Sequence, residues 1–545
     1  MTAAAAGIEA PSLIRWRYAA LLLLSGLAVA LVELRMPSIV GIPAPLMDVT
    51  RLLLGFVGVL FALDAAKQFP RLPWLQPWIV ILLAFIGCVA AGWLGGVSWP
   101  NSGDEYSYVF LADTFRAGRL WDPPPPDPLL FEAFHVLVKD GRTFCPYPPA
   151  WSVLLVPFRA LRSLWLINPL LTAALGAILV GLYRRLGLRA EMQAPTLTLV
   201  LLTPFTLFLG GSLFPQTMAA VLVAAIVWVQ LIDEAQPRFW RKLLIGALFG
   251  VLLVTRYDVF AVAALPYAID RLVLRRFAGI IDGLVAVLGV LPFALGFMAY
   301  NAAITGNPLQ LAATWAASNH DNPAMTALLR VLLPFVLNLY WLGNLAAFGG
   351  LAVLLMAGIA LHAKIRRRTC RFYDFLLPAA VLFYSFVPFS GGHQYGPRYW
   401  FWAWPLGTVT IATGLADSLG YVRAFGRHVS FERLAAAVLL TVTASFGVLL
   451  ITTHGYIAAR RAVFEPAPST ERAVVLVPDR TLRLWWWPDI QAPALDFTRN
   501  DIDYGGKVLY ALGDVPDAAR RACRLSGRAV FRWEEPGRLI PVACP

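Results

Sequence analysis

The chain has 545 residues, of which 59% are hydrophobic and only 14% are charged, whereas soluble proteins carry about a quarter charged residues. This composition excludes soluble enzymes, nucleic-acid-binding proteins and disordered scaffolds, and it predicts a polytopic membrane protein. The formal net charge of +13 lies in short clusters between apolar runs, as in the cytoplasmic loops of membrane proteins, so we expect no nucleic-acid partner.

The first 76 residues predict a cytoplasmic tail and two accessory transmembrane helices, at 18–33 and 49–66. Arg15 and Arg17 precede the first apolar run, as in a signal peptide, but no small-residue cleavage site follows it. We therefore expect a retained anchor. The third apolar run, 77–95, begins a predicted transmembrane core that extends to residue 455.

If the N-terminus is cytoplasmic, the polar loop 96–148 lies outside the membrane. It contains four consecutive prolines, Pro123 to Pro126, and cannot itself cross a bilayer. The next segment, 149–165, is apolar but short, and Arg159 and Arg162 interrupt it. A full crossing there would place every later basic cluster outside, so we expect a helix at the outer interface.

From residue 167 onward, apolar runs alternate regularly with basic clusters. Basic residues follow every second run, in the clusters Arg184/Arg185/Arg189, Arg238/Arg241/Lys242, Arg271/Arg275/Arg276, Lys364/Arg366/Arg367/Arg368 and Arg423/Arg427. Placing all of them in the cytoplasm predicts about 13 transmembrane helices and an external C-terminus. A second outer loop, 301–333, then carries His320 and Asp321, which are a weak signal for a metal site.

Residues 456–545 are polar and predict a small external α/β domain. Segments typical of strands lie at 473–477, 507–511, 528–533 and 538–543, and a segment typical of a helix lies at 516–523. The last two strands are expected to form a hairpin around Glu535-Pro536-Gly537. Cys523 and Cys544 flank this hairpin in an oxidising compartment, which makes them candidates for a disulfide.

The first candidate site is Gly103-Asp104-Glu105-Tyr106, near the start of loop 96–148. A predicted helix follows over 106–117, so both carboxylates lie at a helix N-terminus, whose dipole favours their ionised form. An ionised carboxylate at the membrane surface can act as a general base on a hydroxyl or amine. We therefore predict Asp104 and Glu105 as catalytic residues; the alternative is that they only cap the helix.

The second candidate site joins two predicted spans. Its segment, 391–400, concentrates glycines together with His393, Gln394, Tyr395, Arg398 and Tyr399. Arg398 beside exposed backbone amides suits a phosphate through its charge and its fork of N–H donors. We predict that Arg398 and Tyr399 bind a donor phosphate; the alternative is a turn whose arginine reaches lipid head groups.

A third polar cluster, Arg256-Tyr257-Asp258, interrupts an apolar stretch on the outer side, where a charge needs a partner or a function. We predict Arg256 as a second phosphate ligand; the alternative is that Asp258 simply neutralises it. The predicted substrate pocket takes in the remaining aromatic and polar side chains of these segments, namely Tyr106, Tyr147, Tyr257, His393, Gln394 and Tyr395.

A carboxylate base and a phosphate-binding arginine on the outer face suit the transfer of a sugar from a polyprenyl phosphate. The leaving phosphate is already acidic, so one base and one positive charge suffice. Glycosidases, in contrast, need a second carboxyl group because their leaving alkoxide must be protonated. The lipid tail of such a donor would also explain the membrane location.

The same residues resemble the polytopic GT-C glycosyltransferases that use lipid-phosphate sugars, which include protein O-mannosyltransferases and bacterial aminoarabinose transferases. The resemblance covers roughly 77–410 and rests on Gly103-Asp104-Glu105-Tyr106, Tyr147-Pro148-Pro149 and Gly396-Pro397-Arg398-Tyr399. It implies that Asp104 is the catalytic base and that loop 301–333 follows the seventh core helix. The extra N-terminal helices and the C-terminal domain depart from the simplest members.

The resulting hypothesis is a hexosyl- or pentosyltransferase of the bacterial inner membrane, with its active site and C-terminus on the periplasmic side. Its expected partners are the lipid-linked donor, an acceptor lipid, glycan or protein, and membrane lipids. Glu105 would orient the site or assist a divalent metal, and the presence of such a metal is left open. The alternatives are a transporter or flippase of lipid-linked precursors, whose ionisable residues should lie near the bilayer midplane, and a scaffold for envelope assembly.

Overall fold

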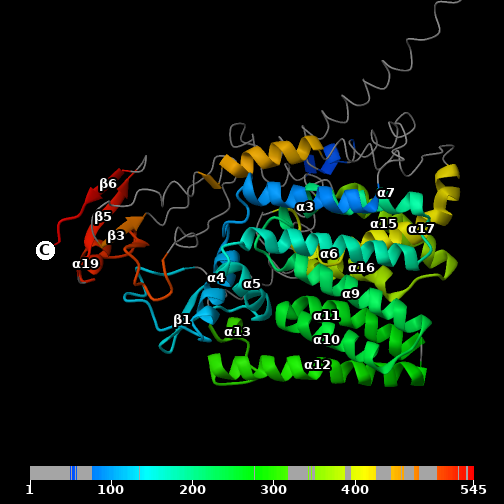
Figure 1. Cartoon of the computed structure of the whole chain (residues 1–545), viewed down its shortest axis with the longest axis horizontal. Helices are drawn as coiled ribbons and strands as arrows, with labels where there is room; N and C mark the ends of the chain where they lie inside the picture. The colour runs from blue at the N-terminus through cyan, green and yellow to red at the C-terminus, as the bar shows by residue number, and fades with distance from the viewer. Residues whose placement is uncertain are drawn as a thin grey trace, which may run out of the picture.

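The computed structural model describes the chain at 49–57 in part, 76–133, 135–274, 276–316, 342, 345, 350–386, 395–424, 443–455, 457–458, 472–477, 500–525, 527–534 and 538–544. Several predicted features lie outside these residues: the anchor at 18–33, the hairpin turn 535–537, His320, Asp321, His393 and Gln394. Over the described ranges, the protein is a body of helices with a small β-sheet domain at one end (Figure 1).

The helices of the body run side by side and reverse direction along the chain (Figure 1). In chain order, the helices and helical turns are α3 (Pro77–Trp93), α4 (Gly103–Arg116), α5 (Ala150–Ala160), α6 (Leu164–Arg185), α7 (Ala190–Leu201), α8 (Pro204–Leu209), α9 (Gln216–Ala235), α10 (Phe239–Thr255), α11 (Tyr257–Ile269), η2 (Asp270–Leu274), α12 (Arg276–Thr305), α13 (Ala312–Ala316), α15 (Leu351–Arg367), η3 (Phe372–Phe375), α16 (Leu376–Ser385), η4 (Arg398–Trp400) and α17 (Trp404–Ala424). Loop 96–148 also contains a hairpin of β1 (Leu137–Lys139) and β2 (Arg142–Phe144).

Three described helices are long and apolar enough to cross a membrane: α6, α9 and the Gly279–Thr305 part of α12. Several such helices in one chain indicate a multi-pass membrane protein. The outward face of α12 supports this conclusion, because Leu284, Val287 and Leu291 expose 61%, 58% and 46% of their surface, which suits contact with lipid rather than water. The count of about 13 spans stays a prediction.

The opposite face of α12 packs tightly against α10 through small residues. A Cβ atom added at Gly246 of α10 would lie 1.9 Å from the carbonyl oxygen of Ala286 in α12. A Cβ added at Gly289 of α12 would likewise lie 2.2 Å from the carbonyl oxygen of Leu243. The two backbones therefore touch directly, as small residues allow between membrane helices.

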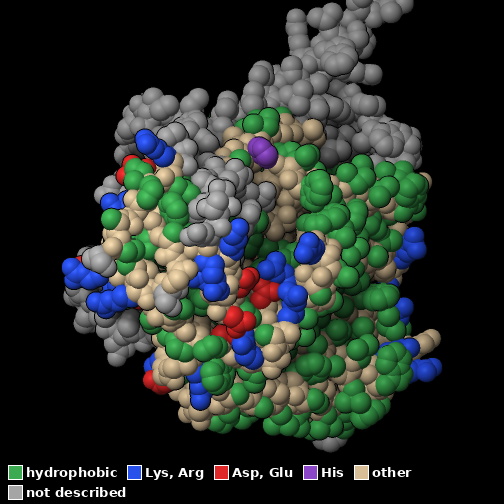
Figure 2. Space-filling view, turned by 60° about the vertical axis from the view of Figure 1, so that its left-hand side comes forward, with side chains coloured by type: hydrophobic (Ala, Val, Ile, Leu, Met, Phe, Trp, Pro, Cys, Tyr) green, Lys and Arg blue, Asp and Glu red, His purple; other side chains and the backbone are tan. Residues whose placement is uncertain are grey.

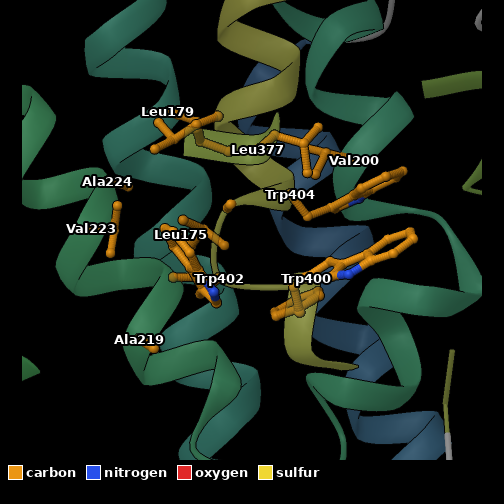
Figure 3. Packing of buried hydrophobic residues seen from close by; sticks show 14 of the residues in the cluster. Leu175, Leu179, Val200, Ala219, Val223, Ala224, Leu377, Trp400, Trp402 and Trp404 are labelled. Atoms are coloured by element: carbon orange, nitrogen blue, oxygen red, sulfur yellow. The ribbon is translucent and has the colours of Figure 1, made fainter. Parts of the chain in front are cut away.

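A group of tryptophans fills the centre of the body. Trp400, Trp402 and Trp404, which lead into α17, are all buried. Figure 3 shows them between α6, which contributes Leu175, and α7, which contributes Val200. This packing fixes the start of α17 and, with it, the neighbouring segment that carries Arg398.

Contacts between helix ends place basic residues at one end of the body and α4 at the other (Figure 1). Arg185, at the end of α6, donates to a backbone carbonyl near the end of α9 at 3.0 Å. Arg271 of η2 pairs with Glu234 in the same region, at 3.2 Å. At the opposite end, Asn168 near the start of α6 donates to the carbonyl of Phe214, just before α9, at 2.9 Å. Residues of two of the predicted basic clusters thus lie at the end of the body away from α4.

The short segment after loop 96–148 forms α5, a helix of 11 residues. This is shorter than the roughly 20 residues that a membrane crossing needs. Helix α5 packs against α4, and a bend at residues 161–163 separates it from α6. The structure therefore contains the short helix that was expected over 149–165, distinct from the long helix that follows it.

The C-terminal sheet has the strand order β4-β3-β5-β6, made of β3 (Ala473–Val477), β4 (Val508–Leu512), β5 (Ala529–Glu534) and β6 (Arg538–Pro541), with α19 (Ala518–Cys523) beside it. Each element overlaps the segment predicted for it. Strand β3 is parallel to both of its neighbours and all its residues are buried, as its uninterrupted apolar sequence requires. Cys523 and Cys544 form a disulfide with Cα atoms 5.5 Å apart.

Candidate active site

Both predicted carboxylates lie in the first turn of α4. Ser102 caps this helix, because its side chain accepts a hydrogen bond from the backbone N–H of Glu105 at 3.3 Å. Helix α4 begins at Gly103, three residues before the predicted start, so Asp104 and Glu105 are inside the helix rather than ahead of it. Adjacent positions on a helix point about 100° apart, and the two carboxylates consequently face different surroundings.

Asp104 faces three side chains from distant parts of the sequence. Arg398 donates from Nη2 to Oδ2 of Asp104 at 2.6 Å, and the Tyr147 hydroxyl donates to Oδ1. Nε2 of His135 lies 3.4 Å from the same Oδ1 atom. Burial favours a higher pKa, but Arg398, His135 and Tyr147 together outweigh it and hold the pKa of Asp104 below its ordinary value. Asp104 is therefore ionised at neutral pH.

Glu105 points away from this group into the protein. Its side chain is fully buried, and it accepts hydrogen bonds from the backbone N–H groups of Asn101 at 2.9 Å and Leu213 at 3.0 Å. Burial raises the pKa of Glu105 to about 8, although these N–H groups oppose the shift. Glu105 thus lies away from the group around Asp104, and its raised pKa is contrary to the ionised form expected from the helix dipole. Its expected catalytic or orienting role stays a prediction.

Arg398 lies in η4, directly after a tight turn at Tyr395 and Gly396, which adopt φ angles of 66° and 87°. Its side chain is only 7% exposed, and its guanidinium carbon lies 4.3 Å from the ring centre of Phe214 and 5.6 Å from that of Tyr399. Among the described residues, no group accepts a hydrogen bond from Nε or Nη1 of Arg398. These two donors are available to an anion.

Arg256 is already bonded to its neighbour Asp258. Its Nε and Nη2 atoms donate to the two carboxylate oxygens at 2.9 and 2.6 Å, and the Tyr384 hydroxyl donates to Asp258 at 2.8 Å. The alternative left open by the sequence, that Asp258 neutralises Arg256, is therefore the arrangement in the structure. Arg256 still lies close to the site, because its guanidinium carbon is 5.3 Å from the ring centre of Tyr399.

Of the other predicted pocket residues that the structure describes, Tyr147 is the one with a hydrogen bond to Asp104. Tyr395 is 1% exposed; its hydroxyl accepts a hydrogen bond from Asn101 at 2.5 Å, and its ring stacks on Phe208. Tyr106 packs under the C-terminal sheet, and Tyr257 is 36% exposed beside Asp258. Tyr395 and Tyr106 thus support the fold, because their rings are taken up by packing contacts.

His135 was not predicted from the sequence. It is one of only 6 histidines in the chain and lies in the same predicted outer loop as Asp104, which is the signal that would have identified it. The hairpin β1–β2 was also not predicted; its turn at Asp140 and Gly141 has φ angles of 48° and 72°. An Asp-Gly pair with such angles is typical of a tight hairpin turn.

The C-terminal sheet packs against loop 96–148 from the outside. The backbone N–H of Leu512 donates to the carbonyl of Leu130 at 2.8 Å, and Arg521 pairs with Asp127 at 2.9 Å. Apolar residues of β3 and β4 pack against Phe110 of α4. Figure 2 is turned so that the side of the molecule with the C-terminal sheet comes forward. Acidic and basic side chains gather at the centre of this view, next to a flank covered by hydrophobic side chains.

Within the part of the chain that the structure describes, no group of three or more His, Cys, Asp and Glu side chains could hold a metal ion. The pair Asp104 and His135 is the nearest approach to such a group in the site. The predicted His320 and Asp321 lie outside the described residues.

No protein-family model and no curated protein matches the chain. Among solved structures, the archaeal oligosaccharyltransferase AglB from Archaeoglobus fulgidus, in complex with an inhibitory peptide and a dolichol-phosphate, is 11% identical, with 84% of this chain and 69% of that chain covered and a TM-score of 0.45. ArnT from Cupriavidus metallidurans bound to undecaprenyl phosphate is 12% identical, with 84% and 93% covered and a TM-score of 0.49. Both likenesses are distant, and we base the functional proposal on the contacts of Asp104 and Arg398.

Proposed function

We propose that the protein is a membrane glycosyltransferase that moves a hexose- or pentose-type sugar from a polyprenyl phosphate to an acceptor lipid, glycan or protein. The proposal rests on the ion pair between Asp104 and Arg398, whose charged atoms are 2.6 Å apart. This pair joins an ionised, partly exposed carboxylate to a guanidinium that keeps two buried donors without partners among the described residues.

The donor atoms of Arg398 support a phosphate ligand. A buried polar group without a partner costs about 1–3 kcal/mol, and a ligand that accepts its hydrogen bonds is one explanation for its retention. Phosphate oxygens form charge-assisted hydrogen bonds with guanidinium N–H groups. We assign Arg398 and Tyr399 to the donor phosphate. We assign Arg256, which already donates to Asp258, to supporting the ring of Tyr399.

In the proposed reaction, Asp104 accepts the proton of the acceptor hydroxyl or amine while that atom attacks the anomeric carbon of the sugar. The bond between this carbon and the phosphate oxygen breaks, and the phosphate leaves with the electron pair beside Arg398, which offsets its growing charge. A carboxylate has about four acceptor positions, so Asp104 can take this proton while it is held by Arg398 and Tyr147.

We further propose the bacterial inner membrane as the location, with the site and the C-terminal domain on the periplasmic side. Two observations support this side. Basic residues such as Arg185 and Arg271 gather at the end of the helices away from α4, as expected for a cytoplasmic end. The disulfide between Cys523 and Cys544 suits an oxidising compartment.

The decisive experiment is transfer by the purified protein in proteoliposomes. A panel of labelled undecaprenyl-phosphate hexoses and pentoses serves as donor, extracted envelope lipids, glycans and proteins serve as acceptors, and release of undecaprenyl phosphate is measured. We expect Asp104→Asn to lower turnover about 10²- to 10⁴-fold at unchanged protein level. Asp113→Asn is the matched control, because Asp113 lies on the same helix but pairs with Arg159 at the surface.

Two outcomes would contradict the proposal. Retained turnover in Asp104→Asn would remove the assigned base. Movement of the labelled lipid between leaflets without cleavage of the sugar–phosphate bond would favour the flippase alternative instead.

A further inference from the structure

We infer that His135 receives the acceptor's proton from Asp104 and so acts, through that carboxylate, as a positioning and proton-accepting residue of the transfer reaction. The inference rests on the proposed function. It depends on three features of His135: its distance from Asp104, the way its ring is held, and its access to solvent.

The first feature is the geometry around the carboxylate. Nε2 of His135 lies 3.4 Å from Oδ1 of Asp104, whereas Arg398 holds the other oxygen, Oδ2. The imidazole and the guanidinium therefore occupy different ends of one carboxylate. Arg398 and Tyr147 donate hydrogen bonds to Asp104 and so cannot take a proton from it. Among the described contacts of Asp104, the imidazole nitrogen of His135 is therefore the base that can accept the proton.

The second feature is that α4 itself holds the His135 segment in place. The hydroxyl of Ser107, one helical turn after Asp104, donates to the backbone carbonyl of His135 at 2.6 Å. The imidazole ring also lies 5.5 Å from the ring of Tyr147, measured between ring centres. Since Ser107 and Asp104 share one face of the helix, the histidine is fixed relative to the carboxylate that it serves.

The third feature is a route for the proton to leave. The His135 side chain is 24% exposed, compared with 17% for Asp104 and 7% for Arg398. His135 is thus more exposed than either partner of the ion pair. A proton on its ring can pass to solvent without moving the ion pair behind it.

The charges that face the imidazole favour a neutral ring before the reaction. They are the Asp104 carboxylate and the Arg398 guanidinium. Burial lowers the pKa of His135; Asp104 opposes this change and Arg398 adds to it, so the pKa stays below its ordinary value. A neutral imidazole at neutral pH can accept a proton.

The proton balance then closes within the site. The acceptor's O–H or N–H bond breaks and its proton goes to Asp104, while the sugar–phosphate bond breaks and the phosphate takes the electron pair. Protonated Asp104 has lost its attraction to Arg398. Transfer of the proton to His135 restores this ion pair and leaves an imidazolium beside a carboxylate, which is a favourable pair. The imidazolium finally releases the proton to water.

The test is the pH dependence of turnover in the proteoliposome assay, with whichever undecaprenyl-phosphate sugar of the panel the native protein cleaves. For the native protein, we expect kcat to fall as the pH drops through the pKa of His135, because a protonated ring cannot accept a proton. For His135→Gln, we expect a kcat about 10- to 100-fold lower with the KM for the donor unchanged, and this acid limb should disappear. The control, His454→Gln, changes a histidine that contacts the Leu94 carbonyl outside the site and should keep the native profile.

A second measurement needs no turnover. The ring of His135 is titrated by NMR in histidine-labelled protein, as native and as Asp104→Asn. Because the Asp104 charge favours the imidazolium, its removal should lower the pKa of His135. An unchanged pKa would overturn the inference even if His135→Gln failed to fold.

The remaining outcomes separate the inference from the proposed function. If the native protein cleaves the donor and His135→Gln keeps the acid limb, the inference fails and the function stands. If His135→Gln loses activity and larger amounts of added zinc or magnesium restore it, His135 is a metal ligand and the inference also fails. If the native protein cleaves no donor, both fail.

Discussion

Two buried ion pairs, at opposite ends of the helical body, show how a structural pair differs from one that is available for chemistry. Lys364 and Asp374 lie 2.7 Å apart, with side-chain exposures of 5% and 0%. Hydroxyl groups of Thr410 and Thr413 complete the bonding, and no side-chain nitrogen or oxygen of the pair lacks a partner. Such complete pairing is what burial of two charges requires.

The pair of Asp104 and Arg398 is almost as deeply placed but incomplete. Asp104 keeps 17% of its side chain exposed, and two donor atoms of Arg398 have no partner among the described residues. The comparison teaches that burial of an ion pair is no sign of function by itself. The two pairs differ in the unsatisfied donors of Arg398 and in the exposure of Asp104, and the following predictions test this difference.

The largest effect on stability is expected at the complete pair. Lys364→Met would leave the fully buried Asp374 carboxylate without its partner charge, at a cost of about 3–5 kcal/mol. The fraction of folded protein and the midpoint of thermal denaturation in detergent would measure this loss. Lys364→Met/Asp374→Leu should recover most of it, and a single variant as stable as the native protein would contradict the comparison.

The next effect is expected at the disulfide of the C-terminal domain. Cys523→Ser opens a link between residues 21 positions apart, so we expect the C-terminal domain to lose about 3 kcal/mol. Donor binding below the new unfolding temperature should be unchanged. Cys370→Ser, which alters a free cysteine, is the control, and equal unfolding of the two variants would count against a stabilising disulfide.

At the incomplete pair, the expected loss concerns binding rather than folding. Arg398→Met removes charge-assisted hydrogen bonds worth about 1.5–3 kcal/mol, so the affinity for undecaprenyl phosphate should fall about 10- to 100-fold. The fold should persist, because Asp104 keeps Tyr147 and some solvent exposure. Isothermal titration calorimetry in detergent measures the affinity, and the midpoint of thermal denaturation measures folding. Unaltered affinity, or a protein that no longer folds, would make this pair structural like that of Lys364.

The last prediction is a dependence of stability on pH at Glu105. Its pKa rises from its ordinary value near 4.5 to about 8 in the fold, so between these values the folded protein keeps a proton that the unfolded chain has lost. Stability should therefore decrease as the pH rises through this window. Glu105→Gln cannot ionise and should flatten this part of the curve of denaturation midpoint against pH; a slope equal to that of the native protein would refute the assignment.

Much of the local structure could be predicted from the sequence. The uninterrupted apolar strand around Val475, the alternating strand around Phe531 and the helix after Gly103 follow from patterns within a few residues, and the structure contains them. The membrane character follows from composition alone. The hairpin at Asp140 and Gly141 was also encoded locally, and its Asp-Gly signal was overlooked.

The functional site was predictable only in part. The candidates Asp104, Arg398 and Tyr147 do come together, but the sequence could not show that Arg256 is occupied by Asp258 or that Tyr395 is packed in the core. Those outcomes depend on which partner each side chain meets, and the partner of Tyr395 is 294 residues away in sequence.

By itself, the sequence determined that this is a multi-pass membrane protein with a helix-borne carboxylate pair after an apolar run and a small α/β domain, because hydrophobicity and periodicity act over short stretches of chain. Only the tertiary structure decided which carboxylate meets Arg398, which one is buried against backbone N–H groups, and that His135 joins the site. The rotation of one helix settles this choice, since Asp104 and Glu105 are neighbours in sequence, and helix packing over a separation of 294 residues sets that rotation.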